Sequence, residues 1–271
     1  MKKIIASILL FTTLGGILCS CGMTEKTATD TTDKVTVAAS EPAESGADTV
    51  EYFDMYEDET ISAASPEATD EGYNSVFQMH YMSMNCENIM QEEIGMPFGC
   101  EVVSLAITLK YFGHDISPNM LFRGFMPNDV YGKANPYYQY VGDPTDDTGY
   151  GCYAPCVVTT ANEYLTRQKS PRRAKDVSGS SMYELLGYVW NGIPVIIWGT
   201  LNMSPTSKVA DSWMFNGERV TWYSLSHCVV ICGVQDDDFI ICDPMVGKVK
   251  YPIKDVEAAY KLINSQAVVI Y

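Results

Sequence analysis

Residues 91–113, with the sequence QEEIGMPFGCEVVSLAITLKYFG, decide how this chain folds. The glycines and the proline that precede Cys100 keep that part of the stretch out of regular structure. The apolar residues from Val102 to Phe112 predict a helix that is buried on most sides, and the glycine after it is typical of a helix end. The stretch therefore places a cysteine at the start of a buried helix.

A cysteine at a helix N-terminus has a physical reason to be reactive. Unpaired backbone N–H groups and the helix dipole favour the thiolate over the thiol, and the same N–H groups can hold an oxyanion. The alternative is that Cys100 is only a small buried apolar residue. Other parts of the chain have to decide between the two interpretations.

Residues 1–20 have the form of a signal for export. Lys2 and Lys3 precede an apolar run, residues 4–18, that is too short to span a membrane comfortably. The sequence Leu-Cys-Ser-Cys at residues 18–21 resembles a bacterial lipobox, in which Cys21 becomes the lipidated residue. Cys19 fits this pattern less well, because a leucine would then occupy a position that requires a small side chain. We expect an exported lipoprotein, anchored on the outer face of the cytoplasmic membrane; the alternative is an ordinary cleaved signal in which both cysteines are incidental.

Residues 21–75 differ in composition from the rest of the chain. They hold 14 acidic and two basic side chains and no apolar periodicity, so most of the net charge of −16 lies here. Such a segment cannot bury enough apolar surface to order itself, and its charges repel one another. We expect a disordered acidic tether, followed by one domain over residues 76–271. The charge gives no support for binding to nucleic acid.

The rest of the domain mixes helical and strand patterns. Residues 126–151 suit an ordered loop that lines a cleft, residues 203–220 a loop over a groove, and the basic segment 167–175 a solvated loop. Helices are predicted over residues 120–125, 154–165, 181–191 and 254–263, and strands over residues 194–198, 227–234, 239–242, 248–253 and 267–271.

Two of these strands form a hairpin that carries a second group of reactive residues. His227 begins the first strand and Asp243 follows the second, so an antiparallel return brings imidazole and carboxylate to one end of the sheet. His80 and His114 lie in loops without such a partner. Alone, His227 would be an ordinary core histidine. Together with Cys100 it supplies the nucleophile, base and orienting acid that acyl transfer requires.

At this point the residues resemble a known family. The similarity is to the bacterial cysteine peptidases that are related to the double-glycine-leader processing peptidases of bacteriocin exporters, in their stand-alone extracellular branch. It is carried by Gln91, Pro97–Glu101, Ser104–Leu105, Tyr111–Gly113, Asn135–Pro136, Val141–Pro144, Gly149–Gly151, Tyr153–Pro155, Asn191–Val195, Trp198, Ser226–His227 and Asp243–Pro244.

The resemblance implies an α+β, papain-like fold in which an N-terminal helical part carries the nucleophile and packs on an antiparallel sheet. It implies that Cys100 is the nucleophile, His227 the general base and then acid, and Asp243 the residue that orients the histidine. Gln91 would be an oxyanion-hole donor, although it can equally be a polar loop residue. Phe98 stands where the family more often has a small residue, which would narrow access to Cys100.

The function that we expect from the sequence is that of a lipid-anchored extracytoplasmic thiol peptidase or amidase. It would act through an acyl-enzyme on a peptide or peptidoglycan-type substrate, as a monomer, without a metal ion or another cofactor. One alternative is a papain-fold binding lipoprotein without catalysis, and another is a leader peptidase linked to a transporter. The remaining thiols are expected to be mostly free, although their even number permits pairing. They are Cys86, Cys152, Cys156, Cys228, Cys232 and Cys242.

Overall fold

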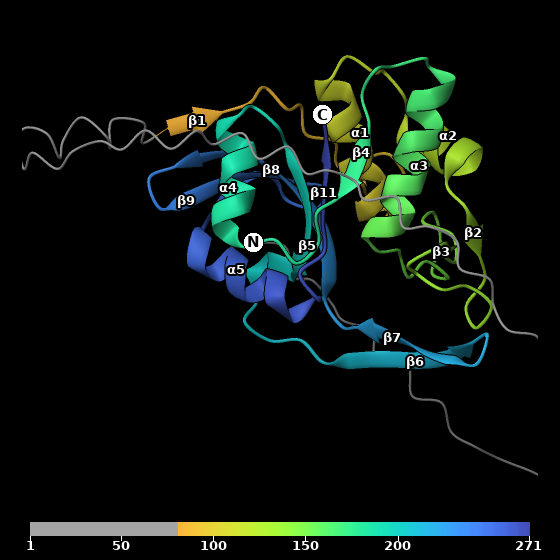
Figure 1. Ribbon diagram of the computed structural model, residues 1–271. Helices are drawn as coiled ribbons and strands as arrows, with labels where there is room; N and C mark the ends of the chain where they lie inside the picture. The colour runs from red at the N-terminus through yellow and green to blue at the C-terminus, as the bar shows by residue number, and fades with distance from the viewer. Residues whose placement is uncertain (1–80) are drawn as a thin grey trace, which may run out of the picture. The chain divides into compact units, whose positions relative to one another are not determined.

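The computed structural model describes residues 81–271 (Figure 1). The predicted signal, the lipidation site Cys21 and all of the predicted tether, residues 21–75, therefore lie outside the described residues. The described helices are α1 (Cys100–Tyr111), α2 (Pro118–Phe125), α3 (Ala154–Arg167), α4 (Met182–Trp190), α5 (Ile253–Leu262) and the short 3-10 helix η1 (Leu201–Met203).

An antiparallel sheet forms the centre of the domain, with strand order β10-β9-β8-β5-β11-β4 and with β1 paired to β8. Two short strands, β2 and β3, pair in the loop before α3. The strands are β1 (Tyr81–Ser83), β2 (Asn128–Asp129), β3 (Tyr140–Val141), β4 (Ala174–Asp176), β5 (Val195–Thr200), β6 (Val209–Phe215), β7 (Glu218–Tyr223), β8 (Ser226–Gln235), β9 (Asp238–Asp243), β10 (Gly247–Pro252) and β11 (Ala267–Ile270).

Helices cover both faces of this sheet. All six residues of β5 and all four of β11 are buried, as their unbroken apolar sequences predict for strands covered on two sides. Figure 1 shows α1, α2 and α3 gathered on one side of the sheet and α4 and α5 on the other. The fold is thus the predicted α+β, papain-like arrangement of N-terminal helices packed on an antiparallel sheet.

Helix α1 is the most deeply buried helix of this arrangement. Ten of its 12 residues are buried, in agreement with the prediction from its apolar sequence. Ser104 ties it to the sheet, because its hydroxyl donates a hydrogen bond of 3.0 Å to the carbonyl of Cys228 on β8. The packing of α1 on β8 brings the start of the helix to the end of the strand that carries His227.

Most of the predicted elements are present within two or three residues of their expected ends. Helix α4 begins with a capping box between Ser181 and Glu184, and Gly192 follows it with a positive φ of 71°. The predicted hairpin of residues 227–234 and 239–242 is the pair β8 and β9.

The prediction of a loop over residues 203–220 is wrong. Strands β6 and β7 occupy most of this segment and form a separate two-stranded hairpin, which Figure 1 shows apart from the main sheet. Asn216 and Gly217, with φ of 48° and 85°, make the turn. An Asn-Gly pair is a strong hairpin signal because both residues accept positive φ. Trp213 and Trp222 are the buried anchors of this hairpin.

Candidate active site

Cys100 is the first residue of α1, and Gly99 precedes it as the N-cap. No side chain caps the helix, so no cap side chain competes for the first backbone N–H groups. A Cβ atom at Gly99 would lie 3.0 Å from Cβ of Met96 and 3.1 Å from its carbonyl oxygen, so the tight turn between Met96 and Gly99 favours glycine. Cys100 itself is 8% exposed. The sequence therefore places the thiol at the start of a helix, where it is almost completely shielded from solvent.

The thiol of Cys100 contacts two groups. Its sulfur donates a hydrogen bond to Oε2 of Glu101 at 3.3 Å and accepts one from the backbone N–H of Cys228. Burial raises the pKa of the thiol well above its ordinary value, and the charge of the neighbouring carboxyl raises it further. The hydrogen bond from the Cys228 N–H acts in the opposite direction. In this arrangement Cys100 is a neutral thiol.

His227 and Asp243 form the buried pair that the hairpin predicts. Nε2 of His227 lies 2.8 Å from Oδ1 of Asp243, and the two residues are 3% and 1% exposed. The backbone N–H of Met245 donates to the same carboxylate oxygen at 2.8 Å. Burial alone would raise the pKa of Asp243, but the hydrogen bonds and the charge of His227 outweigh it, so the pKa lies below its ordinary value. The carboxylate is therefore held in its ionised form.

The nucleophile candidate and the histidine are neighbours without a direct hydrogen bond. Cys228, whose N–H binds the sulfur of Cys100, directly follows His227 on β8. Within residues 81–271, no hydrogen bond joins the sulfur to either ring nitrogen of His227. The bond to Asp243 occupies Nε2 and leaves Nδ1 available for a partner. A turn of the thiol about its side-chain bonds is needed before the two groups can interact.

Gln91 lies between the segments that precede Cys100 and follow Asp243. Its backbone N–H donates to the carbonyl of Pro244 at 2.9 Å, and its side-chain Nε2 donates to the carbonyl of Pro97 at 2.5 Å. The residue is 3% exposed, and its Oε1 is buried with no hydrogen-bond partner. The side-chain N–H of Gln91, the predicted oxyanion donor, is therefore directed at the backbone carbonyl of Pro97.

Phe98, the residue expected to narrow access to Cys100, packs against the predicted cleft loop. Its side chain is 41% exposed, and a Cβ on Gly149 would come within 2.7 Å of the Cβ of Phe98. The hydroxyl of Tyr140 donates to the Phe98 carbonyl at 2.6 Å, and this fixes the backbone before the nucleophile candidate. The predicted cleft loop, residues 126–151, therefore packs against the segment that leads into α1.

Glu101 is the site residue that the sequence analysis missed. It is 2% exposed, and its Oε1 accepts a hydrogen bond from the backbone N–H of Cys152 at 3.2 Å. Burial raises its pKa to about 7, although hydrogen bonds, among them that from Cys152, oppose the shift. The available signal was a charged residue directly next to Cys100 at the start of a helix that is otherwise apolar on most sides.

The other thiols are buried and free in the described residues. Cys232 and Cys242 lie on neighbouring strands with their sulfur atoms 3.5 Å apart. Among residues 81–271, no group of three or more His, Cys, Asp or Glu side chains could hold a metal ion. A helix long and apolar enough to cross a membrane is likewise not found in this part of the chain.

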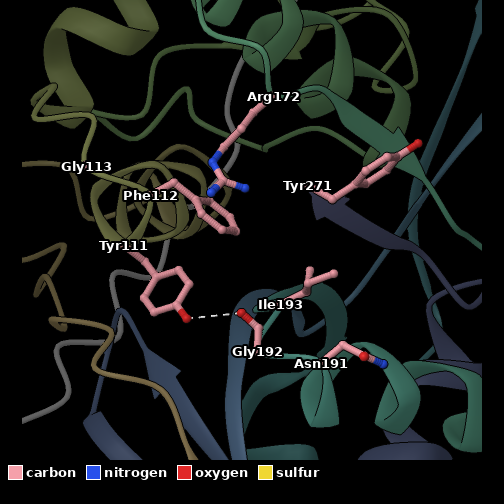
Figure 2. Close-up of a pocket in the computed structure, with 8 residues that line it drawn as sticks. All are labelled: Tyr111, Phe112, Gly113, Arg172, Asn191, Gly192, Ile193 and Tyr271. Carbon is pink, nitrogen blue, oxygen red and sulfur yellow. Dashed lines mark hydrogen bonds between the residues drawn. The ribbon is translucent and has the colours of Figure 1, made fainter.

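A pocket of about 600 Å³ lies at the other end of α1 (Figure 2). Its wall includes Phe112 and Arg172, whose guanidinium carbon lies 4.0 Å from the centre of the phenyl ring. Residues 167–175 were expected to form a solvated loop, but Arg172 is half-buried and packs on this ring. Since α1 has 12 residues and rises about 1.5 Å per residue, roughly 17 Å separates its ends. The pocket is therefore distinct from the surroundings of Cys100.

The fold and these residues define a papain-like cysteine peptidase type of domain, and comparison with known sequences agrees. The chain belongs to the Peptidase_C39 like family, whose model matches residues 83–268.

Two individual relatives share a little under a third of their aligned residues with this chain. An uncharacterised protein of Bacillus subtilis (strain 168), YvpB, is 29% identical over 210 residues, which cover 74% of this chain and 82% of that protein. A crystal structure from Bacillus anthracis, of a protein assigned as a C39-like peptidase, is 28% identical with a TM-score of 0.63, and the match covers 70% of this chain and 97% of that one.

Proposed function

We propose that this protein is an exported, lipid-anchored cysteine peptidase or amidase that acts through an acyl-enzyme on a peptide or cell-wall substrate. The observation that carries the proposal is the buried pair of His227, near the start of β8, and Asp243, at the end of β9. His227 directly precedes Cys228, whose N–H binds the sulfur of Cys100. A buried imidazole held by a carboxylate beside a helix-start cysteine is the arrangement that thiol acyl transfer uses.

Each residue takes one step in the proposed mechanism. His227 accepts the proton of Cys100 through Nδ1, and the thiolate attacks the substrate carbonyl to form a tetrahedral oxyanion. This intermediate collapses to a thioester while His227 returns the proton to the leaving amine. Water, deprotonated by His227, then hydrolyses the thioester and restores the free thiol. Asp243 keeps the ring oriented throughout.

The oxyanion requires donors that are close to Cys100. We assign this part to the side-chain Nε2 of Gln91, which has to exchange the carbonyl of Pro97 for the oxyanion. Gln91→Ala is expected to lower kcat by about 100-fold or more while leaving the alkylation rate of Cys100 unchanged, since alkylation forms no oxyanion. Equal loss of both rates would contradict this assignment.

The test of the catalytic pair is the rate at which iodoacetamide labels Cys100, followed by mass spectrometry of the peptide that contains it. His227→Ala is expected to slow labelling at neutral pH, because it removes the base. His114→Ala is the matched control, since His114 bonds Ser170 near the far end of α1. Equal labelling rates in the wild type and in His227→Ala would exclude the proposed pair.

A binding lipoprotein without catalysis is the second candidate. One observation favours it, namely that the Cys100 thiol is bonded to Glu101 instead of His227. Broad thiol-peptidase probes that form an acyl or alkyl adduct only with an activated cysteine separate the two functions. A correctly folded wild type that forms no adduct, with Cys100→Ala as the blank, would favour the binding function.

The membrane anchor is a proposal from the sequence of residues 18–21 alone. Detergent phase partitioning of the protein made in a bacterial host tests it. Cys21→Ala is expected to move the protein from the detergent phase to the aqueous phase, while Cys19→Ala, the matched control, leaves it unchanged. Retention of Cys21→Ala in the detergent phase would contradict lipidation at this residue.

A further inference from the structure

The carboxyl of Glu101 is built into the start of α1 as a buried partner of Cys100. Its two oxygens accept hydrogen bonds from different groups. Oε1 accepts one from the backbone N–H of Cys152 at 3.2 Å, and Oε2 accepts one from the thiol of Cys100 at 3.3 Å. With 2% of its surface exposed, the side chain has almost no water to hydrate it. A carboxylate in such a place carries a large desolvation cost, so its position calls for an explanation.

The surrounding backbone leaves room for this carboxyl. At Gly151, a Cβ atom would lie 2.2 Å from Oε1 of Glu101 and 2.9 Å from the ring of Trp222. The φ of Gly151 is +132°, a conformation that residues with side chains rarely adopt. A glycine is therefore required where the chain passes over the carboxyl, and the ring of Trp222, from the β6–β7 hairpin, borders the same space.

No cation balances the charge of Glu101 within the described residues. The titratable groups that sense its charge are all uncharged near neutral pH, and they come from α1, β3, β8 and the segment that enters α3. They are Cys100, Tyr140, Cys152, Tyr153 and Cys228. Burial without a cation raises the pKa of Glu101 to about 7. The carboxyl therefore changes its charge in the neutral range.

We propose that Glu101 is a positioning residue that holds Cys100 as a hydrogen-bonded neutral thiol in the resting protein. While the carboxylate is ionised, a thiolate beside it is disfavoured and the sulfur stays turned away from His227. Once the carboxyl is protonated, its O–H can donate to the sulfur, the direction of the hydrogen bond reverses, and the thiolate is stabilised. The proposal rests on the function above only in making Cys100 the nucleophile.

The proposal predicts an unusual dependence of thiol reactivity on pH. An ordinary thiol reacts faster as the pH rises, because more thiolate forms. Here ionisation of Glu101 opposes that increase, so the reactivity of the wild type should stop rising and level off as the pH passes through 7. A substrate that displaces the sulfur from Glu101 would remove this effect.

The experiment compares iodoacetamide labelling of Cys100 in the wild type and in Glu101→Gln. Glutamine keeps an oxygen for the N–H of Cys152 and offers an N–H to the sulfur. We expect nearly equal rates at about pH 5.5 and a rate for Glu101→Gln that is ~10-fold higher at about pH 8. Glu93→Gln, which removes an exposed charge from the segment before α1, is the matched control and should follow the wild type. Equal or slower labelling of Glu101→Gln at the higher pH would overturn the proposal.

His227→Ala, measured in parallel, separates this proposal from the proposed function. Suppose that Cys100 is labelled at the wild-type rate in His227→Ala but faster in Glu101→Gln. This result would contradict His227 as the base for Cys100 and would still support the proposed role of Glu101. The infrared S–H stretching band of Cys100 gives a second test, which needs no variant of Glu101 and uses Cys100→Ala only as the blank. In the wild type this band should shift to lower frequency as the pH rises through 7, because the hydrogen bond to an ionised carboxylate is stronger. A band that does not move would also overturn the proposal.

Discussion

Replacing Glu101 with glutamine should change how the stability of the domain depends on pH. The folded state raises the pKa of Glu101 from an ordinary 4.5 to about 7. Between these values the folded protein binds more protons than the unfolded chain, so the free energy of unfolding falls as the pH rises. The favourable contribution is complete below pH 4.5 and is lost once the pH has passed 7. A shift of this size corresponds to about 3 kcal/mol.

Urea denaturation at a series of pH values measures this effect. Glutamine has no proton to lose, so the unfolding free energy of Glu101→Gln relative to the wild type should grow by about 3 kcal/mol from below pH 4.5 to above pH 7. A constant offset from altered hydrogen bonding does not affect this slope. Glu93→Gln, with its exposed side chain, should show no such trend. Parallel curves for Glu101→Gln and the wild type would refute a buried carboxyl that titrates near neutral pH.

Three further substitutions test other parts of the fold by the same denaturation assay. Trp198→Phe removes the indole N–H that donates to the Cys152 carbonyl at 2.9 Å. It should lower the free energy of unfolding by about 1–3 kcal/mol, because a buried carbonyl loses its partner. An unchanged free energy of unfolding would mean that the carbonyl finds another donor. Asp243→Asn should reduce the decrease in unfolding free energy at acid pH. The folded state lowers the pKa of Asp243, so its stabilising contribution disappears as the pH falls below the ordinary value of 3.8. An unchanged decrease in acid would contradict an ionised Asp243. Ser181→Ala removes the N-cap of α4 and should cost about 1 kcal/mol, with Ser180→Ala as the neighbouring control.

The parts of the fold that follow from simple periodicity were predictable. The apolar sequence of α1 and the continuous apolar strands β5 and β8 admit few other structures. Pairing of His227 with Asp243 followed from the same reasoning, since the ends of two antiparallel strands must meet. The hairpin of β6 and β7 was missed although Asn216-Gly217 marks its turn, because its strands bury few residues and show weak alternation.

The chemistry of the candidate site was harder to predict because it depends on side-chain direction. The sequence places Cys100 and His227 in one region, but the sulfur points to Glu101, a direction that no periodicity encodes. The burial of Glu101 depends on the passage of Gly151 over it, 50 residues away in the chain. Contacts of this kind arise from tertiary packing and are visible only in three dimensions.

The place of β11 in the sheet constrains the order in which this domain can fold. Residues 267–270 lie between β5 and β4, so within residues 81–271 the one strand that pairs with β4 comes about 90 residues later in the chain. A nascent chain cannot close the sheet until these residues have been synthesised, however much of the N-terminal part is already available. Assembly is therefore expected to be a late and cooperative event, governed by slow long-range pairing rather than by the early helices.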